Sequence, residues 1–533
     1  MADNGGFPED DSLKGEEENE NSATGRAEWG SKKEYVLSLL GYAVGLGSLW
    51  RFPYLCNRNG GGAFLIPYFV GIITCGVPLF FLEVTIGQFS NMSATHVWVI
   101  CPLFKGIGIT QLLVSFMGSV LYIIVIAWSL YYLYRSFESV LPWTTCDNWW
   151  NTHLCVNRLG NVSISETYVN NCTRDLLLEH SAWRKSNVWL EALLQGFYSM
   201  SVTYGGLITM SSYTKFHNNS LRDVVFLTVL GEASSIFCGL VVFSTLGFMA
   251  HHAQIPISDI VSSGSGLGFI IYPEAISHLP VSQLWAVLFF IMLITLGMDS
   301  LFGPMETVIA GTVEAYPSYL QPRRMYVTGG VCLFCFLMSV PYATNGGIYL
   351  LQLLDWYNSS FSILLIGCLE CVVINWIYGW KRFGRDIQMM MGKQYPLVLK
   401  LLSTYVTPLI LFASLVFSLF RYDPPSYGEY IYPEYAKAIG ILMAVVMSLP
   451  IPISLLHQLI KRNGTFCERL LHASKPAYDW RPSRLENREA FLDNTDTHLD
   501  NTDTHLDNTD THLDNTDTHL DYIDPGQADS SAV

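Results

Sequence analysis

The sequence predicts an all-α protein that crosses a membrane about ten times, and composition and hydropathy carry this prediction. Half of the 533 residues are hydrophobic and only 14% are charged, whereas soluble domains have about a quarter of charged residues. Ten apolar runs are long enough for helices across a bilayer, each of which needs roughly 20 residues. We therefore expect a tail over 1–25, a membrane domain over 26–482 and a second tail over 483–533.

The first apolar run, 34–56, is interrupted at its centre. Gly41, Gly45 and Gly47 leave the backbone unshielded, and a helix that breaks in mid-bilayer frees carbonyls and amides that must bind an ion, a substrate or another helix. Close packing of a Gly-rich helix is the alternative. It does not explain Arg51, which is costly in a membrane unless it is paired or faces a wet cavity. We therefore predict a binding site at the break.

The other runs follow with short polar connections, except for one long loop over 141–187. This loop carries Cys146, Cys155 and glycan sequons at Asn161 and Asn171, which suit an extracellular face. The Lys and Arg residues between the other runs fall on the opposite side, as the positive-inside rule expects. An even number of spans places both termini in the cytoplasm. The nine runs after the first are 63–88, 108–138, 188–213, 224–250, 281–312, 325–343, 349–379, 398–420 and 436–460.

Both tails are acidic and poor in apolar residues, so we expect them to be disordered. The net charge is −7 over residues 1–25 and −11 over residues 491–533. Four copies of the heptad Asp-Asn-Thr-Asp-Thr-His-Leu run from Asp493 to Leu520. One apolar residue per heptad cannot form a coiled-coil seam, so a disordered spacer is favoured over a weak metal-binding repeat. The terminal Ser-Ala-Val suits a PDZ groove.

A set of short motifs occurs in the order found in one transporter family. They include Trp29, the block Gly41–Phe64, Gly87-Gln88-Phe89, Leu141-Pro142-Trp143, Ser212-Tyr213-Thr214-Lys215-Phe216, Thr295-Leu296-Gly297-Met298-Asp299-Ser300 and Trp376-Ile377-Tyr378-Gly379. From 26 to 482 the chain resembles the sodium- and chloride-coupled neurotransmitter symporters of the LeuT fold, and is most similar to their glycine and neutral amino acid branch. The resemblance implies two inverted repeats, each with a broken first helix. The second break is expected within 195–206.

The resemblance also implies two sodium sites. The second site is complete and all-oxygen, as a hard cation requires; its set is the carbonyls of Gly41, Val44 and Leu296 and the side chains of Asp299 and Ser300. The first site would use the Ala43 carbonyl, Ser48 and Ser199. Ser48 and Gly231 replace two family asparagines, so this site is weakened, rebuilt with Glu232 nearby, or absent.

A chloride site is implied at Gln195, Ser199 and Ser235, with Phe89 where many members have tyrosine. Chloride dependence is left open.

For the substrate, Gly45 stands where amine transporters of the family place an aspartate. The ligand is therefore expected to bring its own carboxylate, which would meet the Gly45 and Gly47 amides at a broken-helix amino terminus and the Tyr122 hydroxyl. The full set of expected substrate contacts is Ala43, Gly45, Gly47, Tyr122, Tyr198, Ser199, Ser201, Tyr204 and Ser300.

The resemblance implies gates and a disulfide as well. Arg51 would pair with Asp355 on the outer side, and Arg26 with Glu314 on the inner side, with the outer and inner gates opening in alternation. Cys146 and Cys155 match the family's disulfide.

The chain departs from the family after the long loop, because residues 181–196 already read as the approach to the sixth span. The fourth and fifth spans are missing, which leaves three helices in the first repeat against five in the second. The main hypothesis is a plasma-membrane symporter of a neutral amino acid with sodium. The rival is a non-transporting relative that acts as a scaffold or trafficking partner. No catalytic constellation is present, so an enzyme is not expected.

Overall fold

The structure is a computed structural model, and it describes residues 28–148, 151, 186–253, 266–420, 422, 425–427, 430–482 and 491. Eight helices in this part of the chain are long and apolar enough to cross a membrane. They span Gly61–Ser90, Pro102–Arg135, Ser220–His251, Ser282–Ala315, Pro317–Ala343, Gly347–Met391, Leu397–Phe420 and Glu434–Lys461. Each coincides with a predicted apolar run, because length and apolar composition are the properties a bilayer demands of a helix.

Two further spans are interrupted. The first consists of α2 (Lys32–Ala43), a π-helical turn over Gly47–Arg51 and α3 (Phe52–Arg58), and the second consists of α8 (Ser186–Met200) and α9 (Gly206–Ser211). With the eight continuous spans, the described residues therefore contain the ten predicted ones.

The remaining elements are mostly helical. The α-helices are α4 (Leu65–Gly71), α5 (Val77–Ser90), α6 (Gly106–Arg135), α10 (Ser220–Ala253), α12 (Tyr272–Ser277), α13 (Ser282–Ala315), α14 (Pro317–Leu320), α15 (Arg324–Ser339), α16 (Gly347–Asn358), α17 (Phe361–Val372), α18 (Trp380–Met391), α19 (Leu397–Leu401), α20 (Thr407–Phe420), α21 (Glu434–Ser448), α22 (Pro450–Lys461) and α23 (Phe466–Ser474). The 3₁₀ turns span Gly61–Phe64, Val97–Ile100, Pro102–Phe104, Pro142–Thr144, Gln321–Arg323 and Val340–Ala343. The π turns span Ile72–Gly76, Leu267–Ile271, Val373–Gly379 and Leu402–Val406. Strands β1 (Ser426–Tyr427) and β2 (Tyr430–Ile431) form a small antiparallel hairpin that the sequence did not predict.

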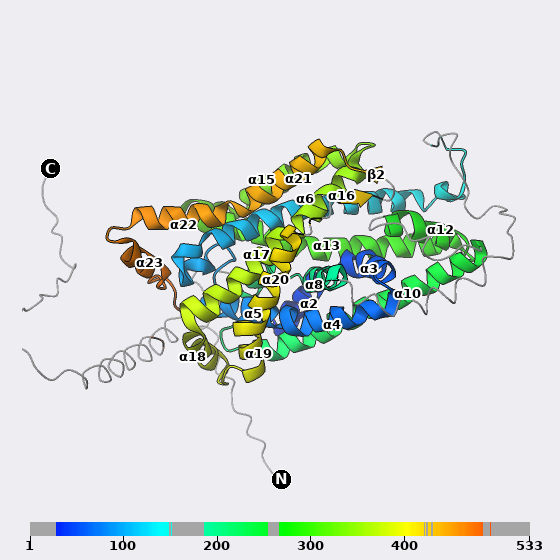
Figure 1. Cartoon of the computed structure of the whole chain (residues 1–533). Coiled ribbons are helices and arrows are strands. Elements are labelled where there is room, and N and C mark those ends of the chain that lie inside the picture. The colour runs from blue at the N-terminus through cyan, green and yellow to red at the C-terminus, as the bar shows by residue number, and fades with distance from the viewer. Residues whose placement is uncertain are drawn as a thin grey trace, which may run out of the picture. The chain divides into compact units, whose positions relative to one another are not determined.

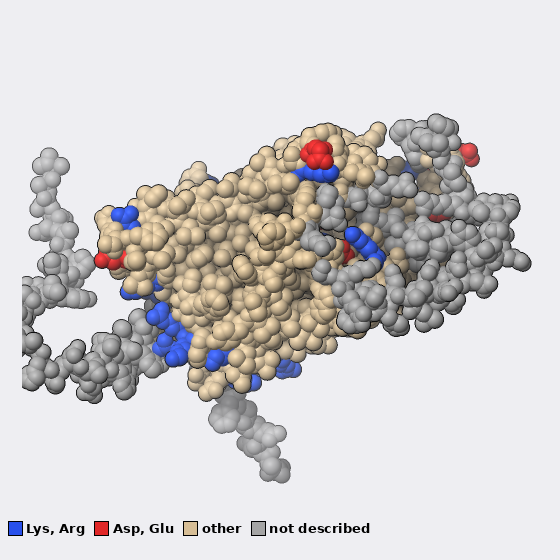
Figure 2. Space-filling view, viewed as in Figure 1, with Lys and Arg blue, Asp and Glu red and all other residues tan. Residues whose placement is uncertain are grey.

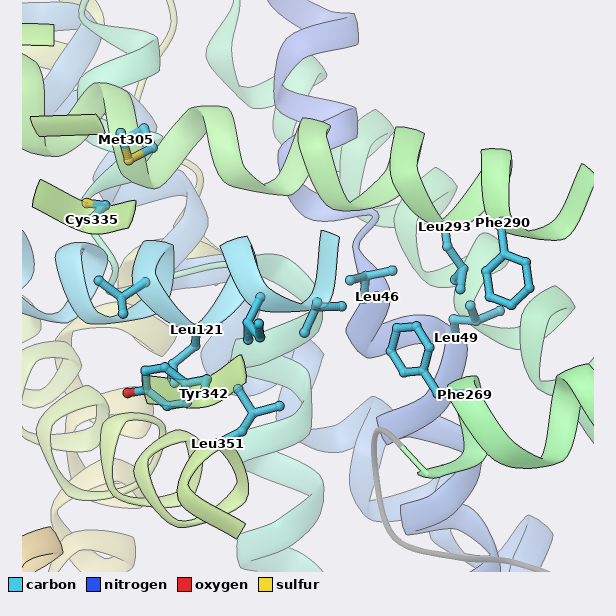
Figure 3. Packing of buried hydrophobic residues seen from close by; sticks show 13 residues of the cluster. Leu46, Leu49, Leu121, Phe269, Phe290, Leu293, Met305, Cys335, Tyr342 and Leu351 are labelled. Carbon is cyan, nitrogen blue, oxygen red and sulfur yellow. The ribbon is translucent and has the colours of Figure 1, made fainter. Parts of the chain in front are cut away.

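Helices α6 and α13 lie side by side and form the centre of the fold (Figure 1). The buried cluster at their contact contains Leu121, Phe290 and Leu293, and also Leu46 and Leu49 from the first interrupted span (Figure 3). Leu46 is 1% exposed. Because lipid is as apolar as leucine, such contacts stabilise a membrane protein by close packing rather than by removal from water. The first break is therefore held against α6 and α13.

Positive charge gathers at one end of the molecule. Figure 2 shows most of the visible Lys and Arg toward the end that carries α18 and α23. Helix α18 has an exposed basic side with Lys381, Arg382 and Arg385. It begins after Gly379, whose φ of 99° ends the preceding span. This is the distribution that the positive-inside rule predicts for a cytoplasmic end.

Candidate functional site

The first break lies where the glycines predicted it. Helix α2 ends at Ala43, and Val44 has φ −88° and ψ 89°, which no helix allows. The chain resumes helical geometry at Leu46, with φ −58° and ψ −23°, directly before the π turn that starts at Gly47. The backbone carbonyls at the end of α2 and the amides at the start of the next turn therefore lack the partners that an unbroken helix would give them.

The second break also lies within the predicted segment. Between α8 and α9, Ser201, Thr203 and Gly205 have φ of 52°, 72° and 80°. A non-glycine residue in this region costs about 1–3 kcal/mol and persists only where its surroundings hold it. The Thr203 amide donates to buried Glu83 on α5, and the Ser201 hydroxyl donates to the Tyr42 carbonyl at 3.0 Å. The two broken helices are thus bonded to each other and to α5.

A small cavity lies between the two breaks. Its volume is about 50 Å³, as the space open to the centres of water-sized spheres. The structure brings all nine predicted substrate residues to its wall, together with Ser48, which was predicted for the first sodium site. Sequence reasoning missed four further residues of the wall: Tyr42, Ser115, Gly118 and Pro304. None of the described lining residues is acidic. The cavity is thus uncharged in its side chains.

Asp299 and Ser300 of the predicted second sodium set lie against the first break, beside this cavity. The Asp299 carboxylate occupies the place of a Gly41 side chain, because a Cβ on Gly41 would lie 1.5 Å from Asp299 Oδ2. A Cβ on Gly45 would lie 2.6 Å from Ser300 Oγ. That hydroxyl is buried and has no hydrogen-bond partner in the described structure. Leu296, Asp299 and Ser300 share one face of α13. The donors are oxygens that suit sodium.

The residues predicted for the first sodium and the chloride form a second cluster. Ser235 Oγ donates to Ser48 Oγ at 2.9 Å, and Ser199 Oγ lies 3.4 Å from Ser235 Oγ. Glu232 of α10 belongs to the same cluster, because it accepts from Ser199 Oγ at 3.1 Å and from Tyr68 Oη at 2.6 Å. Gln195 lies one helical turn before Ser199, fully buried, and neither end of its amide has a hydrogen-bond partner in the described structure.

The structure corrects the assignment of Phe89 to this cluster. Phe89 packs against Phe216 and Trp480, with ring centroids 5.8 and 5.3 Å away. The tyrosine of the cluster is instead Tyr68, on α4. The nearby motif at 87–89 misled the sequence reasoning, because the match of a motif does not show which of two neighbouring aromatic residues faces a site.

The outer side of the cavity is closed by a thin partition. Tyr122 Oη and Tyr198 Oη are 3.0 Å apart, and the Arg51 guanidinium lies 4.6 Å from the centroid of the Tyr198 ring. Arg51 Nη1 is 4.0 Å from Asp355 Oδ2, with the two side chains 22% and 37% exposed. Beyond them lies a vestibule of about 290 Å³ that shares Tyr122 and Tyr198 with the cavity. The predicted outer pair therefore lines the vestibule, next to the two tyrosines that border both spaces.

The inner side is closed by contacts that the sequence reasoning missed. Tyr213 Oη donates to Glu306 at 2.6 Å, and Glu306 also pairs with Arg324 of α15. The Trp29 indole donates to the Met210 carbonyl at 3.0 Å, and the Trp29 amide donates to the Tyr213 carbonyl. These contacts join the end of the second interrupted span to α13, α15 and the start of the chain's described part.

Glu314, the predicted partner of Arg26, accepts from Ser93 Oγ at 2.5 Å and lies 3.3 Å from His96 Nδ1. Arg26 lies outside the described residues, as do Cys155, Asn161 and Asn171. The inner pair, the disulfide with Cys146 and the two glycans stay predictions.

Comparison with known proteins agrees with this geometry. The sequence profile of the sodium:neurotransmitter symporter family matches residues 26–183 and 173–462. Among similar proteins, the sodium- and chloride-dependent glycine transporter 1 of Xenopus laevis is 35% identical over 564 positions, covering 87% of this chain and 89% of that protein. The sodium- and chloride-dependent glycine transporter 2 of the same organism is 34% identical over 590 positions, covering 89% of this chain and 74% of that protein.

Two features of these comparisons bear on the predicted loss of two spans. The profile matches in two pieces that overlap over 173–183, where the sequence predicted the loss. Since 87% of the 533 residues is about 464, about 100 of the 564 aligned positions have no counterpart in this chain. About 100 residues correspond to two membrane helices with their connections.

Proposed function

Because the chain belongs to the sodium:neurotransmitter symporter family, we propose that it couples the entry of sodium to the uptake of a small neutral amino acid of about the size of glycine. The cavity between the two breaks carries this proposal. A buried water needs roughly 10–15 Å³ of space measured in this way, so about 50 Å³ has room for three to five such groups. Glycine has five non-hydrogen atoms. Both similar proteins are named as glycine transporters.

The charges of the site favour a ligand with its own carboxylate. The described cavity wall has no acidic side chain for a ligand ammonium. The Tyr122 hydroxyl and the backbone amides near Gly45 and Gly47, where the second half of the broken helix begins, offer donors to an anion. Asp299 and Ser300 hold the sodium beside it. Substrate and ion would thus be bound side by side, between the first broken helix and α13.

The two sides of the site suggest how access alternates. On the inner side, Tyr213, Glu306, Arg324 and Trp29 form a bonded network. On the outer side, Arg51 and Asp355 are only within 4.0 Å. We infer that outward opening needs little more than rotation of the Arg51 and Tyr198 side chains. Inward opening breaks the Glu306 network while the outer pair tightens.

Uptake of labelled amino acids by cells that express this chain tests the proposal. We expect sodium-dependent uptake of glycine at least tenfold above that of leucine, and loss of uptake when N-methylglucamine replaces sodium. The Asp299→Asn variant, which keeps the side chain's shape without its charge, is expected to lose the uptake. Absence of uptake despite surface expression contradicts the proposal.

The rival function, a non-transporting membrane relative, is favoured by one observation. Beside the partly exposed Asp299, α13 carries Met298 and Phe302, which are 44% and 58% exposed, so no described helix covers this neighbouring side of α13. Binding of labelled glycine to the purified protein, measured without transport, distinguishes the two. Binding without uptake supports the rival.

For location, we propose the plasma membrane with both termini cytoplasmic, glycans on Asn161 and Asn171, a Cys146–Cys155 disulfide and a PDZ partner at Val533. Surface biotinylation, a mobility shift on glycosidase treatment, and loss of PDZ binding on removal of Val533 test these assignments.

A further inference from the structure

Glu232 places a carboxylate in the anion site that the sequence predicted for chloride. It is 6% exposed and lies on α10, one turn before Ser235. Two hydroxyls converge on it: Tyr68 Oη donates to Oε2 at 2.6 Å, and Ser199 Oγ donates to Oε1 at 3.1 Å. Ser199 was one of the three residues predicted to hold the chloride. The carboxylate therefore takes the donors that an anion would need.

A chloride does not fit beside this carboxylate. Two unit negative charges 4 Å apart, at the effective dielectric of about 20 that suits proteins, repel strongly enough to weaken anion binding by about a thousandfold. The third predicted chloride residue, Ser235, donates instead to Ser48 or to the Gly231 carbonyl at 3.2 Å. Of the three residues predicted to hold the chloride, only Gln195 has no hydrogen-bond partner in the described structure. One amide is a poor site for an anion.

Position 231, next to Glu232, also differs from the family's pattern at this cluster. Gly231 is buried, yet apart from its chain neighbours and the nearby backbone of its own helix no atom lies within 4 Å of where its Cβ would be. The family's asparagine would fill this space. The chain thus lacks the family's neutral side chain at 231 and has a buried acid at 232. The two changes lie side by side in the cluster that serves the first sodium and the chloride.

We propose that the Glu232 carboxylate is the fixed anion of this site, so that sodium binding and transport do not require chloride. The negative charge remains next to the Ala43–Ser48 break, where it offsets the positive charge of bound sodium. The inference rests on the proposed sodium-coupled function, because it concerns the same site. It also separates this chain from the two similar proteins described above, which are named as chloride-dependent.

Thermal stabilisation of the purified full chain by sodium tests the inference without transport. The melting temperature is measured in sodium chloride, sodium gluconate and N-methylglucamine chloride. We expect the same half-saturating sodium concentration, within about twofold, in chloride and in gluconate. A wild-type protein that needs chloride for stabilisation by sodium overturns the inference. Glycine uptake in the same salts is a second readout, and its complete absence would count against the proposed transport, not against the anion assignment.

Variants identify Glu232 as the source of independence from chloride. Glu232→Gln keeps the size of the side chain and removes its charge, so sodium in gluconate should stabilise it at least tenfold more weakly, and added chloride should restore the effect. The double variant G231N/E232Q supplies the asparagine expected at 231 and removes the charge at 232, and it should behave in the same way. If Glu232→Gln does not fold, the sodium stabilisation of the double variant in gluconate and in chloride tests the assignment instead. Full independence from chloride in both variants would overturn the assignment to Glu232. Glu434→Gln, an exposed change of equal charge, is the matched control.

Discussion

Adding one methyl group at Gly41 should move the charged ligand of the second sodium site. A Cβ there would lie 1.5 Å from Asp299 Oδ2 and 2.1 Å from Asp299 Cγ, so the carboxylate must rotate away. Moving a unit charge from about 2.5 to about 4 Å from a cation, at an effective dielectric of 20, costs about 2.5 kcal/mol. This corresponds to roughly 70-fold weaker sodium binding.

The assay is sodium-dependent thermal stabilisation of purified Gly41→Ala, with the half-saturating sodium concentration as the readout. Asp299→Asn should give a similar loss. Gly329→Ala is the control, because no atom lies within 4 Å of a Cβ at that helical position, and its sodium dependence should be unchanged. If Gly41→Ala folds and its half-saturating sodium rises by less than threefold, Asp299 does not bind sodium at this place.

Three further outcomes are expected. Gly45→Ala puts a methyl group 2.6 Å from Ser300 Oγ and fills part of the cavity. The Michaelis constant for glycine uptake should therefore rise about 10- to 200-fold, as for a misplaced methylene. An unchanged constant would show that glycine binds elsewhere. Glu306→Gln removes the negative charge that contacts both Tyr213 and Arg324. A membrane-impermeant thiol reagent, applied from the inner side, should then label a cysteine introduced at position 212 more strongly. Equal labelling would show that this network does not close the site. Hydrogen bonds with the Thr465 backbone and side chain hold the pKa of Glu468 below its ordinary value of 4.5. The contact between Thr465 and Glu468 that caps α23 should therefore be intact at pH 4.5 and above, and it should weaken as the pH falls below 4.5. Amide hydrogen exchange at Glu468 that does not change with acidification would contradict this.

The breaks were predictable from local sequence. Glycines at 41, 45 and 47 and the Ser, Thr and Gly run after Met200 mark places where a helix loses side-chain cover or competes with its own polar groups. The structure ends α2 and α8 at these places. Local composition therefore located both halves of the site.

The polar contacts between spans were not predictable in this way. Tyr68 and Glu232 are 164 residues apart, and Tyr213 and Glu306 are 93 apart, so which side chain faces which depends on the packing of whole helices. The wrong choice of Phe89 over Tyr68 has this cause. Glu232 was noticed as a nearby acid, but its partners could be read only from the fold.

The partition formed by Tyr122 and Tyr198 has a consequence for inhibitor chemistry. The same two rings border the cavity of about 50 Å³ and the vestibule of about 290 Å³. A molecule with an amino acid head in the inner space and an aromatic tail in the outer one would pass between the rings and hold Arg51 away from Asp355. Such a compound would compete with substrate, and its potency would depend on the length of the linker that crosses the two tyrosines.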